Sequence, residues 1–541
     1  MWYLYVYLDI VNHDHDYCRI QDGAVEPQEQ VLSVLPMPNV QPHSYTIVPG
    51  TQRNTEIICD NLGNMYYKNK STENKIYLAC LEKKKGECRG TAVISSYREN
   101  KSLKLSNQHS HPVKPYNLDV PFLRQHITEK ALIKTVNSYV PRGIYMESIV
   151  NFPEAANNYT FIQCAERMRR LRQGMFPATP QNISEFHNLL SNDENQMFTL
   201  TLQNLQFYQG PLVVNGVIKG VLFCNIAHIQ KIKQNLRNVR VAGCDGTFKT
   251  VPKFLDNDAY QIFSFHILFK NVSFPLVHAI LTGKTQDIYI QLLRYVRSVL
   301  PLSYADLIII TDYEYGLINA AKIVFPESKT QGCYFHFCQA VIRYTRVKKS
   351  QIFHLITSNL NAICILRMIL ALPYLPATRI DALPSMEDGF NEVVKYVNQF
   401  PDLAVKLNDF LIDYIWKYWF LTMTPENVSV YNQEIRTNNY IESYHASLLR
   451  LIKPHPKVWE FINQLQFLEN QYNIEFQQLI NNLNIRRSKH VRNHNTEVIR
   501  DLIQKLVNDR DPTRIIIFLR RAGHRVDGYI AQEIGIHPDD E

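Results

Sequence analysis

Two short acidic signatures contain the residues of this chain that are best suited to chemistry. Asp245 lies within residues 244–248 (CDGTF), and Asp312 follows the apolar run of residues 307–310 (LIII). A carboxylate at the end of a buried strand points into the crevice at the carboxyl edge of a sheet. Two such edges can share metal ions, and carboxylate-bound divalent cations promote displacement reactions at phosphorus.

Residues 436–445 (RTNNYIESYH) offer a third carboxylate. Asn438 or Asn439 can cap a helix whose first turn carries Glu442 near the positive end of the helix dipole. From there the helix can lay Glu442 across the two aspartates. Mg²⁺ prefers hard oxygen ligands of this kind. Three further acids near the signatures could be outer metal ligands but are expected to be solvated: Glu314, Asp256 and Asp258.

The hydrophobic pattern around these acids predicts the elements that position them. Alternating or continuous apolar runs predict five strands, and apolar residues at helical spacing predict two helices. In chain order the elements are strands 238–244, 260–269 and 273–281, helix 286–300, strand 306–310, helix 315–324 and strand 330–335. This is the order of a ribonuclease-H-like α/β fold, in which the first and fourth strands lie side by side. Asp245 and Asp312 would then end neighbouring strands.

Four motifs in this region, in this order, resemble the catalytic domain of Mutator-like element transposases over about residues 236 to 475. They are residues 245–248 (DGTF), residues 311–326 (Thr-Asp, then Ala-Ala and Val-Phe-Pro), residues 332–337 (GCYFHF) and residues 437–442 (TNNYIE). The resemblance implies a DNA transposase of the DDE type, whose metal-binding triad is Asp245, Asp312 and Glu442 with Mg²⁺ or Mn²⁺. It also implies transposon ends and target DNA as partners, a homo-oligomer on DNA, and the nucleus as the place of action.

Cys333 and His336 have the Cys-x-x-His spacing of the family's signature and follow the predicted fifth strand. They could hold zinc with two other ligands, but Cys338, Cys364, His445 and His455 are scattered and single out no site. The alternatives are a buried thiol beside a hydrogen-bonded histidine, or a role in DNA contact. We treat Cys333 and His336 as a possible structural pair.

Residues 44–115 contain short strands with polar turns, two cysteines and two histidines. Cys80, Cys88, His109 and His111 supply the four ligands of a tetrahedral zinc site, and a small domain gains much of its stability from such a metal. The segment is similar to a FLYWCH-type zinc finger, which implies these four residues as Zn²⁺ ligands. It lacks that family's tryptophan shortly before the first cysteine, where Leu78 and Ala79 stand.

Clusters of basic residues indicate surfaces that could contact DNA phosphates, although each cluster could also be a solvent-exposed group of charges with no such role. They lie in the hairpin beside the zinc ligands, in the helical region before the catalytic domain, and near the C-terminus. The candidates are Lys83, Lys84, Lys85, Arg89, Arg169, Arg170, Arg486 and Arg487. The last two belong to residues 486–492 (RRSKHVR), which could serve as a nuclear import signal or a DNA clamp.

Length and composition place the chain among multidomain α+β proteins. The 541 residues predict three to four domains, the net charge of +8 is mild, and ten dispersed cysteines do not form a disulfide framework. No apolar run reaches membrane length, so no membrane partner is expected. The predicted segments are a tail (1–43), the finger (44–115), a helical DNA-end-binding region (116–235), the catalytic domain (236–345 and 431–480), a helical insertion (346–430) and a C-terminal basic segment with an acidic tail (481–541).

Two function classes are compatible with these patterns. The first is an active transposase that binds terminal repeats and performs metal-dependent strand cleavage and transfer. The second is a domesticated relative that keeps the finger as a DNA-binding transcriptional regulator and uses the catalytic fold only as a scaffold. Acidic residues are present at all three triad positions, which favours the active transposase.

Overall fold

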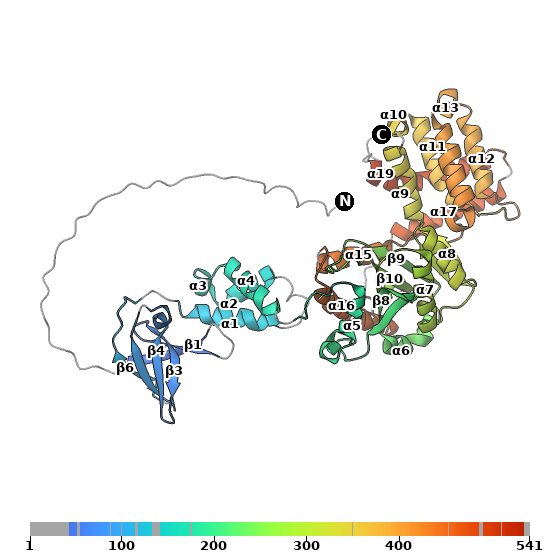
Figure 1. Ribbon diagram of the computed structural model, residues 1–541. Helices are drawn as coiled ribbons and strands as arrows, with labels where there is room; N and C mark the ends of the chain where they lie inside the picture. The colour runs from blue at the N-terminus through green and yellow to red at the C-terminus, as the bar shows by residue number, and fades with distance from the viewer. Residues whose placement is uncertain are drawn as a thin grey trace, which may run out of the picture. The chain divides into compact units, whose positions relative to one another are not determined.

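The computed structural model describes most of the chain as two compact units, residues 1–122 and 123–541 (Figure 1). The described residues are 43–50, 55–86, 88–98, 100–113, 117–132, 141–173, 176–348, 350–452, 454–485, 491–509 and 511–534. The predicted tail, apart from His43, therefore lies outside the described residues.

The first unit contains a closed six-stranded barrel of antiparallel strands. Its strands are β1 (His43–Pro49), β2 (Glu56–Asp60), β3 (Met65–Ser71), β4 (Lys75–Cys80), β5 (Thr91–Ser95) and β6 (Ser102–Asn107). Alternate residues of each strand face the barrel interior, and a barrel of six strands has a small interior. Leu78 belongs to this buried cluster, together with Tyr66 and Leu103. Leu78, which stands near the expected position of the finger family's tryptophan, thus packs in the core of the barrel.

Short helices follow the barrel in the first part of residues 116–235, whereas strands Tyr208–Val214 and Val217–Cys224 of the same range belong to the central sheet, outside the predicted catalytic-domain boundary of 236. These helices are α1 (Asp119–Leu132), α2 (Pro141–Asn151), α3 (Pro153–Ala156) and α4 (Phe161–Gln173). The Tyr145 hydroxyl donates a hydrogen bond to the Tyr159 carbonyl at 2.9 Å, which ties α2 to the loop before α4.

A seven-stranded mixed sheet lies at the centre of the second unit, in the order β13-β12-β9-β10-β11-β8-β7. The strands are β7 (Tyr208–Val214), β8 (Val217–Cys224), β9 (Val241–Thr247), β10 (Gln261–Phe269), β11 (Val272–Leu281), β12 (Ile308–Thr311) and β13 (Lys329–Gly332). β12 runs parallel to β9 and β13, whereas β10 is antiparallel to β9 and β11. The predicted ribonuclease-H-like order of the five strands is confirmed.

One predicted strand is shorter than expected. Residues 330–335 were predicted to be extended, but β13 ends at Gly332 and helix α9 (Tyr334–Arg343) begins two residues later, with Cys333 as its N-cap. Tyr334 is buried and donates a hydrogen bond to the Leu370 carbonyl at 2.8 Å. Tertiary packing therefore overrides the strand preference of the aromatic pair Tyr334 and Phe335.

Helices cover both faces of the sheet (Figure 1). Successive strand residues face opposite sides, so Phe263 joins one core and Ile262 the other. The first core includes α6 (Ile226–Leu236), α7 (Gln286–Val299) and α8 (Tyr315–Val324); the second includes α5 (Ile183–Leu190), α15 (Asn439–Ile452) and α16 (Val458–Ile480).

The predicted helical insertion forms a bundle with the C-terminal part of the chain. A shared apolar core joins α9, α10 (Ser350–Ser358), α11 (Leu360–Ala371), α12 (Met386–Val397), α13 (Pro401–Asp409), the π-helix Phe410–Thr422, α17 (Val491–Asn508), α18 (Arg514–Gly523) and α19 (Asp527–Ile534). The predicted C-terminal segment and tail thus contain three helices, α17, α18 and α19, in the described part of the chain. Phe518 and Leu519 are buried in this core because their helix is amphipathic.

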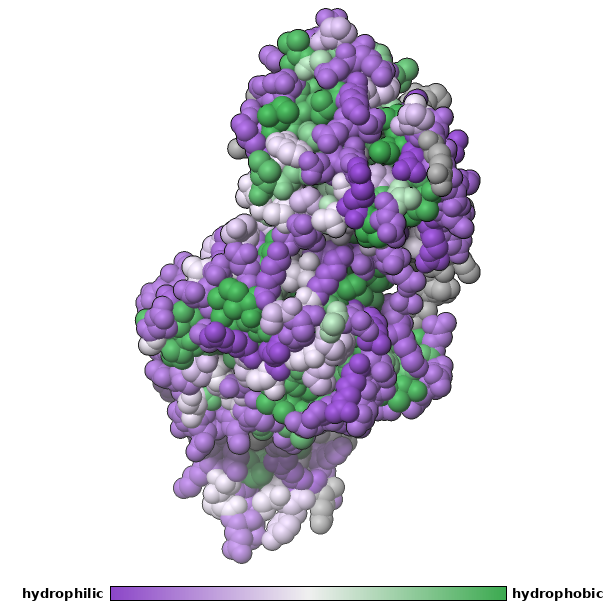
Figure 2. Space-filling view, turned by 90° about the vertical axis from the view of Figure 1, so that its right-hand side faces the viewer, coloured by the Kyte–Doolittle hydropathy of each residue, from purple (hydrophilic) through white to green (hydrophobic). Residues whose placement is uncertain are grey.

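None of the described helices is by itself long and apolar enough to cross a membrane; one bent pair, residues 351–358 with 360–374, meets that test on length and composition only. On the face that Figure 2 shows, hydrophilic side chains predominate and hydrophobic ones form separate patches. The cysteines among the described residues form no disulfide.

Candidate functional site

The parallel pairing of β9 and β12 brings the two aspartates to one edge of the sheet. The last paired residues are Ile310 and Gly243. Asp312 and Asp245 each lie two residues beyond that pair. Asp312 directly follows the end of β12, whereas Asp245 lies within β9, which runs on to Thr247 instead of ending at the predicted residue 244, and is paired with Ser264 of β10. Neighbouring strands are about 4.8 Å apart. The two aspartates therefore occupy matching positions on adjacent parallel strands, as the predicted strand order requires.

Helix α15 brings Glu442 to the same edge. Glu442 lies in the first turn of α15, whose Ile441 and Glu442 amides donate to the Asn438 carbonyl at 2.7 and 3.3 Å. The helix approaches β9 closely at Gly243, where an added Cβ would overlap the Tyr440 hydroxyl and lie 3.1 Å from Ile441 Cδ1. A glycine at this strand position therefore permits the approach that positions Glu442.

The electrostatics of the site show that the three carboxylates interact. Burial raises the pKa of Asp245 to about 7, and the charges of Asp312 and Glu442 act in the same direction. Burial also raises the pKa of Asp312. The nearby His336 opposes both shifts. Like charges that share a buried site disfavour ionisation unless a cation compensates them.

An oxygen-only donor set of this kind fits Mg²⁺ or Mn²⁺. Among the described residues, the three carboxylates do not have all their ligand atoms within 4.8 Å of one another. Two metal ions about 3.5 to 4 Å apart need ligands on both sides of the pair. Asp245, Asp312 and Glu442 are the residues that would hold such a pair.

Cys333 and His336 connect α9 to the start of α15. His336 Nε2 lies 3.1 Å from Glu442 Oε1, and the Asn438 amide donates to Cys333 Sγ at 3.4 Å. Burial would lower the pKa of His336, but its interactions with Cys333 and Glu442 raise it to about 11. No third metal ligand gathers around this pair within the described part of the chain. His336 lies in the first turn of α9, where it contacts a triad carboxylate.

His445 is a site residue that the sequence patterns did not single out. Its Nδ1 lies 3.7 Å from Asp245 Oδ2, and its Nε2 lies 3.3 Å from Ser264 Oγ. Ser264 Oγ in turn lies 2.9 Å from Nε2 of the buried His266. Burial lowers the pKa of His445 to about 4, so the ring is neutral at pH 7. The sequence contained one signal for His445: it lies three residues after Glu442, so both side chains project from the same face of a helix.

The three additional acids have different surroundings. Asp256 is exposed and accepts hydrogen bonds from Gln181 and Asn182, whereas Asp258 accepts the Ile183 amide at 2.9 Å. These two acids bind the loop between β9 and β10 to residues 181–183, which are distant in the chain. Glu314 is half-buried rather than solvated, and burial together with Asp312 raises its pKa.

Replacing Gly243 by alanine is expected to lower metal-dependent DNA cleavage by about 10²-fold, because the new methyl group displaces the first turn of α15 and misplaces Glu442. Overpacking should also lower the free energy of unfolding by about 1 to 3 kcal/mol. The measurements are cleavage rate and thermal unfolding.

The double variant G243A/Y440F is the matched control for this prediction. The Tyr440 hydroxyl is buried and has no hydrogen-bond partner among the residues that the structure describes, so Y440F alone should be neutral. Removing that oxygen gives the new methyl group space, and the double variant should recover part of the lost activity. Full activity of G243A alone would contradict the assigned role of this close approach.

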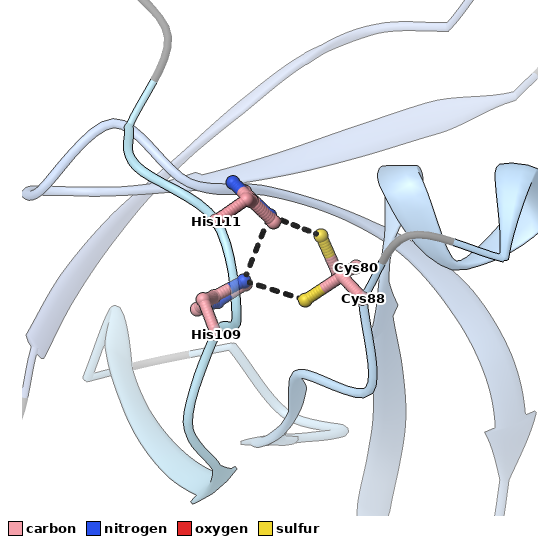
Figure 3. Close-up of side chains that lie close together, drawn as sticks. All are labelled: Cys80, Cys88, His109 and His111. Atoms are coloured by element: carbon pink, nitrogen blue, oxygen red, sulfur yellow. Dashed lines mark hydrogen bonds between the residues drawn. The ribbon is translucent and has the colours of Figure 1, made fainter.

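Four potential metal ligands converge at one end of the barrel (Figure 3). Cys80 Sγ lies 3.2 Å from His111 Nε2, Cys88 Sγ lies 3.5 Å from His109 Nδ1, and the two ring nitrogens are 3.3 Å apart. Tetrahedral zinc, bound about 2.3 Å from sulfur and about 2.0 Å from nitrogen, would separate S–N pairs by about 3.5 Å and N–N pairs by about 3.3 Å. The donor set and spacing therefore fit Zn²⁺.

The other ring nitrogens of both histidines have partners that orient them as ligands. His109 Nε2 lies 2.8 Å from the Tyr66 hydroxyl, which donates to Asp60 Oδ2 at 2.8 Å. His111 Nδ1 lies 2.9 Å from the Pro112 carbonyl, to which it can donate its proton. Such outer contacts set the tautomer and the direction of a metal-binding imidazole.

The predicted DNA-contact residues fall into three groups. Lys83 and Arg89 are exposed beside the four-ligand cluster. Arg169 and Arg170 both bond to Glu166, each at 2.8 Å, and remain largely exposed. The side chains of Lys84 and Lys85, and residues 486 and 487 (Arg486 and Arg487), lie outside the described part of the structure. The interpretation of all eight as phosphate contacts stays a prediction.

Two segments of the chain match known protein families. Residues 241–340 match the MULE transposase domain, and residues 50–111 match the FLYWCH zinc finger domain. A comparison with curated proteins finds no match. The first match covers β9 to α9, including Asp245, Asp312, Cys333 and His336, and ends before Glu442. The second covers the barrel from before β2 through all four potential zinc ligands.

Proposed function

We propose that this chain, which carries a MULE transposase domain and a FLYWCH zinc finger, is a DNA transposase that cuts and joins strands at Asp245, Asp312 and Glu442. The convergence of carboxylates from β9, β12 and α15 on one edge of the sheet is the observation that carries the proposal. These acids are far apart in the chain, yet the charges of Asp312 and Glu442 both act on Asp245.

The protein's own residues divide the work at this edge. Asp245 and Asp312 form the rigid side of the site because Asp245 is paired within the sheet and Asp312 directly follows the adjacent strand β12. Glu442 closes the site from α15, and His336 holds its carboxylate at 3.1 Å. His445 contacts Asp245 from the same helix face as Glu442. Bound Mg²⁺ or Mn²⁺ would make water a stronger nucleophile and stabilise both oxygens of an in-line displacement.

The finger and the basic residues would supply the DNA affinity that the catalytic edge does not provide. The charged hairpin beside the zinc ligands suits phosphate contacts, which position a protein on DNA without reading sequence. We place the protein in the nucleus and expect it to act as a homo-oligomer, because a transposase must hold two transposon ends at once.

Cleavage of DNA from both flanks of the gene tests the proposal. The full chain is incubated with labelled duplexes from these flanks in Mg²⁺, Mn²⁺ or chelator. Strand breaks that leave 3′ hydroxyl groups and require the metal support a transposase. Specific binding without breaks under any metal condition supports the alternative, a DNA-binding regulator that retains the fold as a scaffold.

A further inference from the structure

The loop that follows the first catalytic strand carries an exposed aromatic pair beside the candidate active site. Phe248 follows β9 directly and Tyr260 immediately precedes β10; their rings meet edge to face with centroids 5.3 Å apart. The two residues are 47% and 43% exposed. Phe248 is three residues beyond Asp245, a span of about 10 Å in extended chain.

These two rings are not needed to hold the loop in place. Phe254, in the middle of the loop, is buried against Phe186. The backbone is tied to the segment before α16, since the Lys253 amide donates to the Pro456 carbonyl at 2.8 Å and the Lys249 carbonyl accepts the His455 amide at 3.1 Å. The loop is therefore anchored, and it presents Phe248 and Tyr260 to solvent as a fixed platform.

Exposed lysines lie on the loop of the aromatic pair and on the segment that anchors it. Lys249, Lys253 and Lys457 are exposed, and none pairs with a carboxylate in the described part of the chain. Lys253 and Lys457 are held next to each other by a backbone bridge between the two segments. The loop's two acids, Asp256 and Asp258, accept hydrogen bonds from residues 181–183. The loop thus combines two exposed rings with exposed lysine side chains.

From this combination we propose that Phe248 and Tyr260 stack on an unpaired nucleotide of the strand that the active site cuts, while Lys249, Lys253 and Lys457 hold its phosphates. Aromatic rings bind any exposed base face, and lysines follow the backbone. A duplex hides its base faces, so the occupant is single-stranded DNA. This proposal rests on the proposed cleavage function and adds that the DNA next to the cut site is single-stranded.

The aromatic stripe of the helical bundle does not offer the same opportunity. Tyr414 stacks on Tyr344 with centroids 3.8 Å apart, Trp416 packs on Phe390, and Trp419 is buried. The faces of these rings are packed against other rings inside the bundle. Phe248 and Tyr260 have a larger free area than the stripe residues and lie next to a triad aspartate.

Binding to short oligonucleotides in chelator tests the inference without any cleavage. A single-stranded oligonucleotide carrying 2-aminopurine should bind the full chain with quenched fluorescence, because stacking quenches that base. The double variant F248A/Y260A should lose about 10- to 100-fold in single-strand affinity, together with the quenching, and keep its duplex affinity. F248W should retain both signals.

Two controls separate stacking from general surface effects. L255A removes an exposed apolar side chain from the same loop, and Y97A removes an exposed tyrosine from the barrel; neither should change the single-strand signal. Unchanged single-strand affinity in F248A/Y260A, an equal loss for duplex, or a change in self-association alone would overturn the inference. Cleavage that persists alongside such a result would leave the proposed function standing.

Discussion

Asp245→Asn is expected to reduce metal-dependent DNA cleavage by about 10³-fold or more. The substitution keeps the size of the side chain but removes a negative ligand from the edge shared by β9, β12 and α15. Metal ions contribute several kcal/mol of transition-state stabilisation, and about 4 kcal/mol corresponds to about 10³-fold in rate. The measurement is the single-turnover rate on labelled duplex in Mg²⁺ and in Mn²⁺.

The same variant should fold at least as well as the parent protein in metal-free buffer. Burial and two like charges disfavour the Asp245 carboxylate, so a neutral amide relieves a cost rather than creating one. D306N is the matched control, because Asp306 is an exposed partner of Arg240 in the same domain and should keep full cleavage. Equal cleavage by D245N and the parent would remove Asp245 from the proposed triad.

Cys88→Ala is expected to abolish zinc binding and to unfold the barrel. The barrel has few buried residues for its core, and domains of this size seldom gain more than about 3 to 5 kcal/mol from packing alone. Structural zinc contributes on the order of 10 kcal/mol in comparable small domains. We expect the zinc content to fall from one ion per chain to none, with proteolytic cuts appearing across residues 43–113.

Cys59→Ala is the matched control for the zinc ligand. Cys59 is also buried in the barrel, but its thiol donates to the Asp60 carbonyl at 3.6 Å and does not belong to the four-ligand cluster. C59A removes a sulfur atom, as C88A does, but not a zinc ligand. It should lower the free energy of unfolding by about 1 to 2 kcal/mol, and the protein should keep its zinc. Chelator added to the parent should reproduce the cleavage pattern of C88A, and zinc should reverse it. A protease-resistant barrel in zinc-free C88A would contradict the assignment.

Much of the catalytic fold was predictable because strand and helix periodicities are local properties. Alternation in residues 260–269 and helical spacing in residues 286–300 correspond to β10 and α7. The strand order followed from the sequence of elements, and the parallel pairing of β9 with β12 confirms it. The end of β13 was harder to predict, since the helix at Tyr334 is stabilised by contacts with the distant Leu370 and Tyr374.

Residue types and short spacings were enough to identify the acids at strand ends, the helix that carries Glu442, and the four candidate zinc ligands. The contact of His336 with Glu442, the approach of α15 at Gly243, and the placement of His445 against Asp245 could be seen only in three dimensions. Each of these joins segments separated by about a hundred residues or more. Periodicity specifies which face of an element is apolar, whereas the packing of distant elements determines which polar groups meet at their ends.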